Sequence, residues 1–128
     1  MQKTIFSLLS LFILAVAACD KVENPTEVTF SVTTPTQYQE YHLGDTVKVS
    51  AFIAASANIN AYSVVYKVVG GGQVKYNHKI INQDTVTIQN YWVNNLTNGG
   101  NMQLDIIAEM QPNGGDARTH TIYFNCKE

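Results

Sequence analysis

The sequence predicts an all-β protein, folded as a two-sheet antiparallel sandwich of about seven strands. From residue 28 onward, apolar residues recur at every second position, which is the spacing of a half-buried strand. Turn-forming residues interrupt this alternation at short intervals, as expected for a sandwich. No later stretch has the apolar period of an amphipathic helix.

Residues 1–18 are predicted to be a cleaved signal peptide. Lys3 gives a short positive N-terminal region, and residues 5–16 are apolar except for two serines. This run is shorter than the ~20 residues that a helix needs to span a bilayer, and small residues follow it. We therefore expect the mature protein to fold without this segment.

Val16-Ala17-Ala18-Cys19 resembles the lipobox of bacterial lipoproteins, in which an aliphatic residue and two small residues precede a cysteine. The resemblance implies that a peptidase cuts before Cys19, that the Cys19 sulfur carries a diacylglyceryl group, and that the new N-terminus is acylated. Two or more acyl chains hold a protein stably at a membrane, because each buried CH₂ contributes about 0.8 kcal/mol. Residues 19–27 are then a lipidated, polar tether.

The same resemblance implies a location. The protein is expected to be lipid-anchored in the bacterial cell envelope, at the outer membrane, facing either the periplasm or the cell surface. Asp20 and Glu23 follow the cysteine, and acidic residues at such positions influence the sorting of lipoproteins between membranes.

A second interpretation of the N-terminal segment stays open. Ala15-Val16-Ala17 is an A-x-A pattern, which permits ordinary secretory cleavage after Ala17. Cys19 would then be available to pair with Cys126, the only other cysteine. If Cys19 is lipidated instead, Cys126 has no partner within the chain, and we expect an inert thiol beside the last strand.

One domain is expected over residues 28–126. Its strands are predicted at residues 28–33, 46–53, 59–69, 74–80, 86–93, 102–110 and 119–124, and the alternation is cleanest at 102–110. Segment 59–69 has apolar residues of both parities, which indicates a central strand that is covered on both faces. Small residues at 54–58 predict a loop, and Asn82-Gln83-Asp84 predicts a turn.

Two stretches resemble bacterial immunoglobulin-like domains, including the PKD and fibronectin type III kinds. Gly44-Asp45 opens the second strand, as it often does in those domains, and Leu96-Thr97-Asn98-Gly99 leads into the alternating penultimate strand. Met102 stands where many such domains have a tyrosine. The resemblance implies an immunoglobulin-like sandwich. Some relatives bind calcium through carboxylates in the loop after the second strand, but residues 54–58 contain none, so that site is not expected here.

Charge and composition exclude some classes of partner. The 128 residues carry 8 basic and 10 acidic side chains, a net charge of −2. Removal of residues 1–18 takes away Lys3 and leaves a net charge of −3. Because no basic stripe occurs, we predict no nucleic-acid partner and no electrostatic docking to anionic lipid. The membrane contact is then expected to be the lipid at Cys19 alone.

No pattern in the sequence predicts catalysis, a metal or a cofactor. His42, His78 and His120 lie on separate segments without the spacing of a metal site. Asp105 and Glu109 lie on one predicted strand, where we expect a solvated face rather than a catalytic pair. We therefore predict a protein that is not an enzyme and that holds no cofactor or metal.

The pair Tyr91-Trp92 has two open interpretations, a glycan-binding surface and a part of the core. This pair precedes an asparagine-rich loop at residues 94–101, and aromatic faces beside amide groups suit a glycan. In the other interpretation, Trp92 buries its ring in the core and the asparagines serve turns.

Thr46 and Thr85 each stand in an Asp-Thr-aliphatic triplet. Both triplets resemble the acceptor motif for O-glycosylation in some Gram-negative bacteria. Both are also ordinary strand openings after a turn, so the two interpretations stay open.

Two functions remain from the sequence. The first is a non-catalytic, envelope-anchored lipoprotein that acts as a structural or protein-interaction module with another envelope protein. The second is a small glycan-binding surface lipoprotein that uses exposed aromatic side chains.

Overall fold

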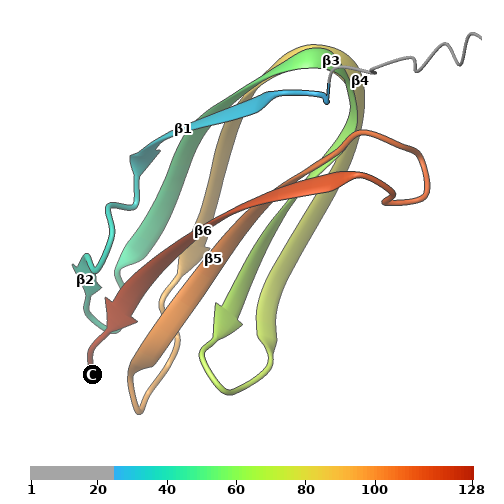
Figure 1. The fold of residues 1–128 in the computed structure, drawn as a ribbon. Coiled ribbons are helices and arrows are strands. Elements are labelled where there is room, and N and C mark those ends of the chain that lie inside the picture. The colour runs from blue at the N-terminus through green and yellow to red at the C-terminus, as the bar shows by residue number, and fades with distance from the viewer. Residues whose placement is uncertain (1–24) are drawn as a thin grey trace, which may run out of the picture.

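The structure, a computed structural model, describes residues 25–128 and contains six strands (Figure 1). The strands are β1 (Val28–Thr34), β2 (Glu40–Tyr41), β3 (Thr46–Val68), β4 (Gln73–Val93), β5 (Gly100–Glu109) and β6 (Ala117–Cys126). The predicted signal peptide, Cys19 and most of the predicted tether lie outside the described residues. Within residues 25–128, no helix is long and apolar enough to cross a membrane.

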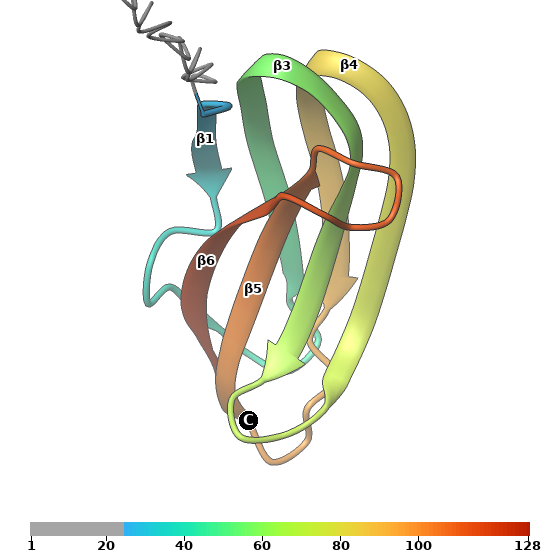
Figure 2. The same ribbon diagram turned by 45° about the vertical axis from the view of Figure 1, so that its right-hand side comes forward.

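β3 and β4 are long strands that bend and pass from one layer of the domain to the other (Figure 1, Figure 2). The first part of β3 pairs with β1, and its second part pairs with β5. β4 runs antiparallel beside β3 along both parts. β6 pairs with β5, and the two residues of β2 join the other edge of β6 in parallel.

These pairings make two layers. The three-stranded layer contains β1, the first part of β3 and the last part of β4. The four-stranded layer contains the first part of β4, the second part of β3, β5 and β6. Apart from the short β2, the layers hold seven strand segments in an immunoglobulin-like β-sandwich. The predicted all-β fold class is therefore confirmed.

The predicted loop at 54–58 and the predicted turn at 82–84 are wrong, since both segments lie inside continuous strands. They are the places where β3 and β4 bend. The β3–β4 register shifts between Ala54 and Ile59, and Asn82 has a positive φ of 50°. A bulge of this kind bends a strand without ending it. Small and turn-forming residues mark the break in alternation, but they do not distinguish a bend from a loop.

The core lies between the layers and is formed by alternate residues of the long strands. Among its largest fully buried side chains are Tyr66, Phe124, Ile53, Ile59, Ile88, Met102, Leu104 and Ile106. The alternation in β5 places Met102, Leu104 and Ile106 inward, as the sequence predicts. Each side chain of this size contributes about 1.5–3 kcal/mol when it is fully buried.

The turn into β5 depends on Gly99. Its φ of +63° is in the left-handed region, and a Cβ there would lie 2.7 Å from the backbone oxygen of Cys126. We expect Gly99→Ala to lower the free energy of unfolding by about 2 kcal/mol, since a backbone neighbour cannot move aside as a flexible side chain does. Urea denaturation followed by circular dichroism measures the loss.

Gly44→Ala is the matched control. Gly44 also has a positive φ, +88°, but a Cβ there would meet nothing within 4 Å. Its expected loss is about 1 kcal/mol, from the backbone conformation alone. Equal losses in the two variants would show that the contact with Cys126 has no effect.

Candidate interaction surface

Trp92 and Tyr91 lie on opposite faces of the last part of β4. The Trp92 side chain is only 6% exposed, and its ring packs against the rings of Tyr66 and Phe124. Trp92 therefore buries its ring in the core, as one of the two interpretations predicts. The other interpretation, that Trp92 contacts a glycan, is wrong, because a buried indole offers no face to a ligand. Tyr91 is exposed and has the Lys75 Nζ atom 4.6 Å from its ring centre. Neighbouring strand residues point in opposite directions, so the pair forms no shared platform.

The asparagine-rich loop is held by Asn94. This side chain is buried, its Nδ2 donates to the Tyr41 carbonyl at 3.4 Å, and its Oδ1 accepts from the Leu96 backbone at 3.1 Å. The turn role predicted for the loop's asparagines is confirmed at this position.

Thr46 and Thr85 are both exposed. Thr46 is the first residue of β3, and Thr85 follows the bend in β4. O-glycosylation at either threonine stays a prediction.

The three histidines occupy separate places. The Nδ1 atom of His42 lies 3.8 Å from Oδ2 of Asp45. His78 lies on β4, and the ring of His120 on β6 stacks on the ring of Phe30. Within residues 25–128, no three His, Cys, Asp or Glu side chains gather where they would hold a metal ion.

Ser63, His78 and Glu109 form a polar cluster on the outer face of the four-stranded layer. The Ser63 Oγ lies 3.0 Å and the Glu109 Oε1 lies 3.9 Å from the same ring nitrogen, Nδ1 of His78. In serine hydrolases the nucleophile and the carboxylate contact opposite nitrogens of the histidine. The cluster therefore lacks the geometry of a catalytic triad.

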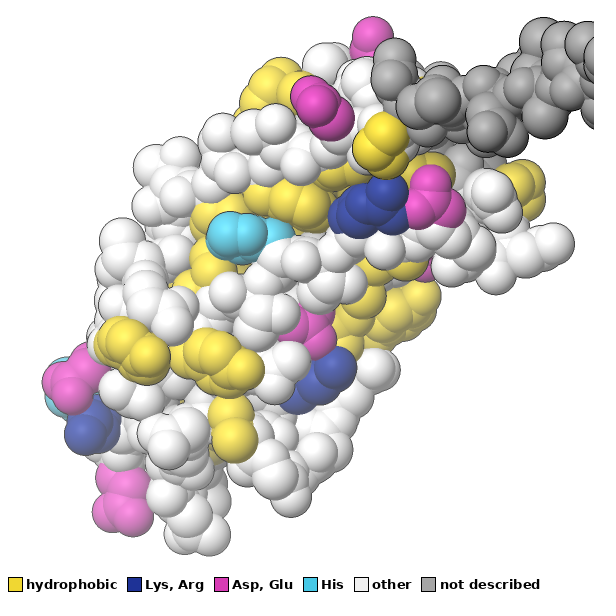
Figure 3. Space-filling model, in the orientation of Figure 1, with side chains coloured by type: hydrophobic (Ala, Val, Ile, Leu, Met, Phe, Trp, Pro, Cys, Tyr) yellow, Lys and Arg dark blue, Asp and Glu magenta, His cyan; other side chains and the backbone are white. Residues whose placement is uncertain are grey.

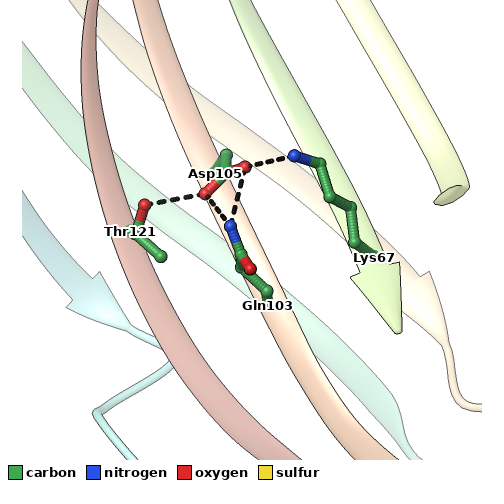
Figure 4. Close-up of polar contacts among 4 residues, drawn as sticks. All are labelled: Lys67, Gln103, Asp105 and Thr121. Atoms are coloured by element: carbon green, nitrogen blue, oxygen red, sulfur yellow. Dashed lines mark hydrogen bonds and ion pairs between the residues drawn. The ribbon is translucent and has the colours of Figure 1, made fainter. Parts of the chain in front are cut away.

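Asp105 is the centre of a second polar cluster on that face (Figure 4). It accepts hydrogen bonds from Gln103 at 2.9 Å and from Thr121 at 2.7 Å, and it forms an ion pair with the Lys67 Nζ at 2.8 Å. Burial alone would raise the pKa of Asp105, but the hydrogen bonds from Gln103, Lys67 and Thr121 outweigh it and lower that pKa.

The solvated position predicted for Asp105 is wrong. Its residue is only 4% exposed, although it points away from the core. Lys67 and Thr121 on neighbouring strands and Gln103 on the same strand contact its carboxylate. Strand alternation alone carries no information about contacts from neighbouring strands. Glu109, four residues along the same strand, is half-buried.

Along the first part of β4, Lys75 and Asn77 point inward, and Val74, Tyr76, His78 and Ile80 point outward. Inward, Lys75 donates to the Tyr91 carbonyl, and Asn77 donates to Asn90 Oδ1 at 3.4 Å. Tyr66 donates to the same Asn90 oxygen at 2.9 Å. The first and last parts of β4 thus meet through polar groups at the open side of the sandwich.

Three of these outward residues, Val74, Tyr76 and Ile80, form a surface that we call the β4 apolar strip, and His78 lies between Tyr76 and Ile80 on the same face. The three strip residues are 38%, 50% and 66% exposed. In the described part of the chain, β4 pairs only with β3, so the strip borders a free strand edge. Exposed apolar side chains beside a free edge are typical of surfaces that bind other proteins.

Cys126 is a buried thiol at the end of β6, and burial raises its pKa to about 11. In a mature chain with Cys19→Ser, we expect Cys126 to react with a disulfide reagent at least about 100-fold more slowly when folded than when unfolded in urea. Absorbance of the released thiolate measures both rates. Similar rates would mean that the end of β6 opens readily to solvent.

Comparisons with known proteins identify no family. A scan against models of protein families and a search of curated proteins both find no match. Similar solved structures include β-glucosidase from Listeria innocua, with 10% identity, a TM-score of 0.48, and coverage of 80% of this chain and 16% of that one. Another is a structure of the fibronectin(III)-like modules of Clostridium thermocellum CbhA, with 13% identity and a TM-score of 0.43. The match covers 77% of this chain and 96% of that one. The chain thus spans only a small part of the β-glucosidase, and the likeness is limited to general architecture.

Proposed function

We propose that this chain is a non-catalytic lipoprotein module, anchored in the bacterial envelope through Cys19, that binds another envelope protein through the β4 apolar strip. The strip carries the proposal, because Val74, Tyr76 and Ile80 expose large apolar side chains along one strand. Each Å² of apolar surface that a partner removes from water contributes about 25 cal/mol.

The free edge of β4 supports a protein partner in particular. An extended segment of another protein can add to a free strand edge through backbone hydrogen bonds, and its side chains then contact the outer face of the sheet. Val65 pairs with Tyr76 and Ala61 pairs with Ile80, so buried apolar residues of β3 lie beside the strip.

The anchor rests on the lipobox resemblance of residues 16–19. The tether of residues 19–27 ends directly before β1, and when extended it reaches at most ~30 Å. A partner that binds the β4 apolar strip is therefore expected to stand at the same membrane.

The anchor is tested by intact mass and by fractionation in a Gram-negative host. The wild-type chain is expected to begin at Cys19, to carry the added mass of lipid, and to sediment with membranes. The Cys19→Ser variant is expected in the soluble fraction. A wild-type chain without added lipid mass, or a Cys19→Ser variant that stays with the membranes, contradicts the proposed anchor.

The surface is tested by photo-crosslinking in intact cells of the native host. A photoreactive phenylalanine analogue replaces Tyr76 in the strip or, as a control, exposed Ser31 on β1. We expect a discrete crosslinked protein from position 76 alone, and we expect Ile80→Asp in the same chain to abolish it. The binding surface is wrong if both positions crosslink alike or if the product survives Ile80→Asp.

A further inference from the structure

We propose that a hollow at the C-terminal end of β6 binds a neutral saccharide, independently of the β4 apolar strip. The hollow has a volume of about 320 Å³ and is lined by Tyr38, Val69, Asn101, Tyr123 and Asn125. Small-molecule sites occupy roughly 300–1,000 Å³, so this hollow suits one or two sugar units. In Figure 3, hydrophobic side chains (yellow) lie near the C-terminal end of β6, with other side chains and backbone (white) between them.

Two tyrosines supply apolar faces. Tyr38 is 66% exposed and Tyr123 is 40% exposed, and in the described part of the chain neither ring stacks on another aromatic ring. The C–H groups on one side of a pyranose ring form an apolar face that matches an aromatic face in size. An exposed tyrosine also keeps its hydroxyl available for a hydrogen bond to the same ligand.

Two amides supply the polar contacts. Asn101 on β5 and Asn125 on β6 are directly paired in the antiparallel register, so their side chains lie on the same face. Each amide offers both donors and an acceptor, which is the combination that a sugar hydroxyl needs. None of the five lining residues is acidic or basic, and this favours a neutral ligand over an anionic one.

The backbone holds these side chains in place before any ligand arrives. Tyr38 has a φ of +63°, which is costly for a bulky residue and is typical of functional sites. Its N–H donates to the Tyr123 carbonyl at 2.7 Å, and the Tyr123 N–H donates to Gln37 Oε1 at 3.1 Å. The Asn125 N–H donates to the Gln39 carbonyl at 2.9 Å. Residues 37–39 are thus fixed to β6 beside the hollow.

The test uses the mature chain with Cys19→Ser on an array of neutral and sialylated oligosaccharides. We expect binding to a subset of the neutral ones, followed by calorimetry with the best of them. Tyr38→Gly removes the ring and also suits the positive φ, so this variant is expected to fold at least as well as its parent. It is expected to weaken binding at least about tenfold, as is Asn125→Ala.

Tyr91→Ala is the matched control, because it removes an exposed tyrosine from the last part of β4 and is expected to leave saccharide binding unchanged. The proposal is overturned if no neutral oligosaccharide binds, if sialylated ones bind equally well, or if Tyr38→Gly binds like its parent. It is also overturned if Tyr91→Ala weakens binding as much as Tyr38→Gly does. Crosslinking from position 76 is not affected by these outcomes, so the protein-binding proposal stands or falls separately.

Discussion

Replacing Trp92 with alanine is expected to lower the free energy of unfolding by about 3–5 kcal/mol. The Trp92 ring fills space between the two layers, where it packs against Tyr66 and Phe124. Its removal loses that buried surface and leaves a cavity, which closely packed strands close only in part. Urea denaturation measures the loss, and circular dichroism is the suitable signal because Trp92 is the only tryptophan.

Two variants separate this effect from any role in binding. Trp92→Phe keeps an aromatic ring in the core and is expected to retain more than half of the stability that Trp92→Ala loses. Tyr91→Ala removes the exposed neighbour and is expected to cost at most about 1 kcal/mol. A Trp92→Ala variant as stable as the Tyr91→Ala variant would contradict the buried position of this ring.

Replacing Asp105 with alanine is expected to cost about 3 kcal/mol at neutral pH, the second-largest effect. The substitution removes the shared acceptor of Gln103 and Thr121, and hydrogen bonds to a charged group contribute roughly 1.5–3 kcal/mol. The ion pair with Lys67 adds little, because the Lys67 side chain is 41% exposed and returns to water. Glu109→Gln on the same strand is the control, with an expected change below about 1 kcal/mol.

The contribution of Asp105 is expected to depend on pH. Its pKa in the folded chain is lowered from 3.8, so the folded state favours the ionised carboxylate. The stabilisation is therefore complete above about pH 5, and it is lost as the pH falls through the folded pKa. The difference in unfolding free energy between wild type and Asp105→Asn, measured in urea from pH 7 to pH 2, is expected to shrink over the acidic part of this range. A constant difference would mean that the charge of Asp105 does not stabilise the fold.

Much of the fold follows from local pattern. Alternation at 102–110 is sufficient to predict both a strand and its inward residues, because successive side chains on a strand point to opposite faces. The same rule separates Tyr91 from Trp92, since neighbours on one strand cannot share a face. The bends at 54–58 and 82–84 do not follow from pattern. A local break in alternation looks the same whether the chain leaves the sheet or only curves within it.

The candidate surfaces depend on tertiary structure more than the strands do. Tyr38 and Tyr123 are far apart in the sequence, and hydrogen bonds between residues 37–39 and β6, together with the pairing of β2 with β6, bring them to one hollow. Asp105 has the parity of an exposed residue, but the side chains of Lys67, Gln103 and Thr121 cover it. Lys67 and Thr121 lie on other strands, so the sequence near Asp105 does not report their contacts.

The sequence by itself determined which residues of each strand share a face, and tertiary structure decided which of those faces meets water. Val74, Tyr76 and Ile80 share one face of their strand with His78, because they stand at alternate positions, and that face is exposed. The physical reason lies on the other side of β4. There Lys75 and Asn77 find polar partners in Tyr91 and Asn90, so burying the polar face leaves no unpaired group and the apolar face is left outside.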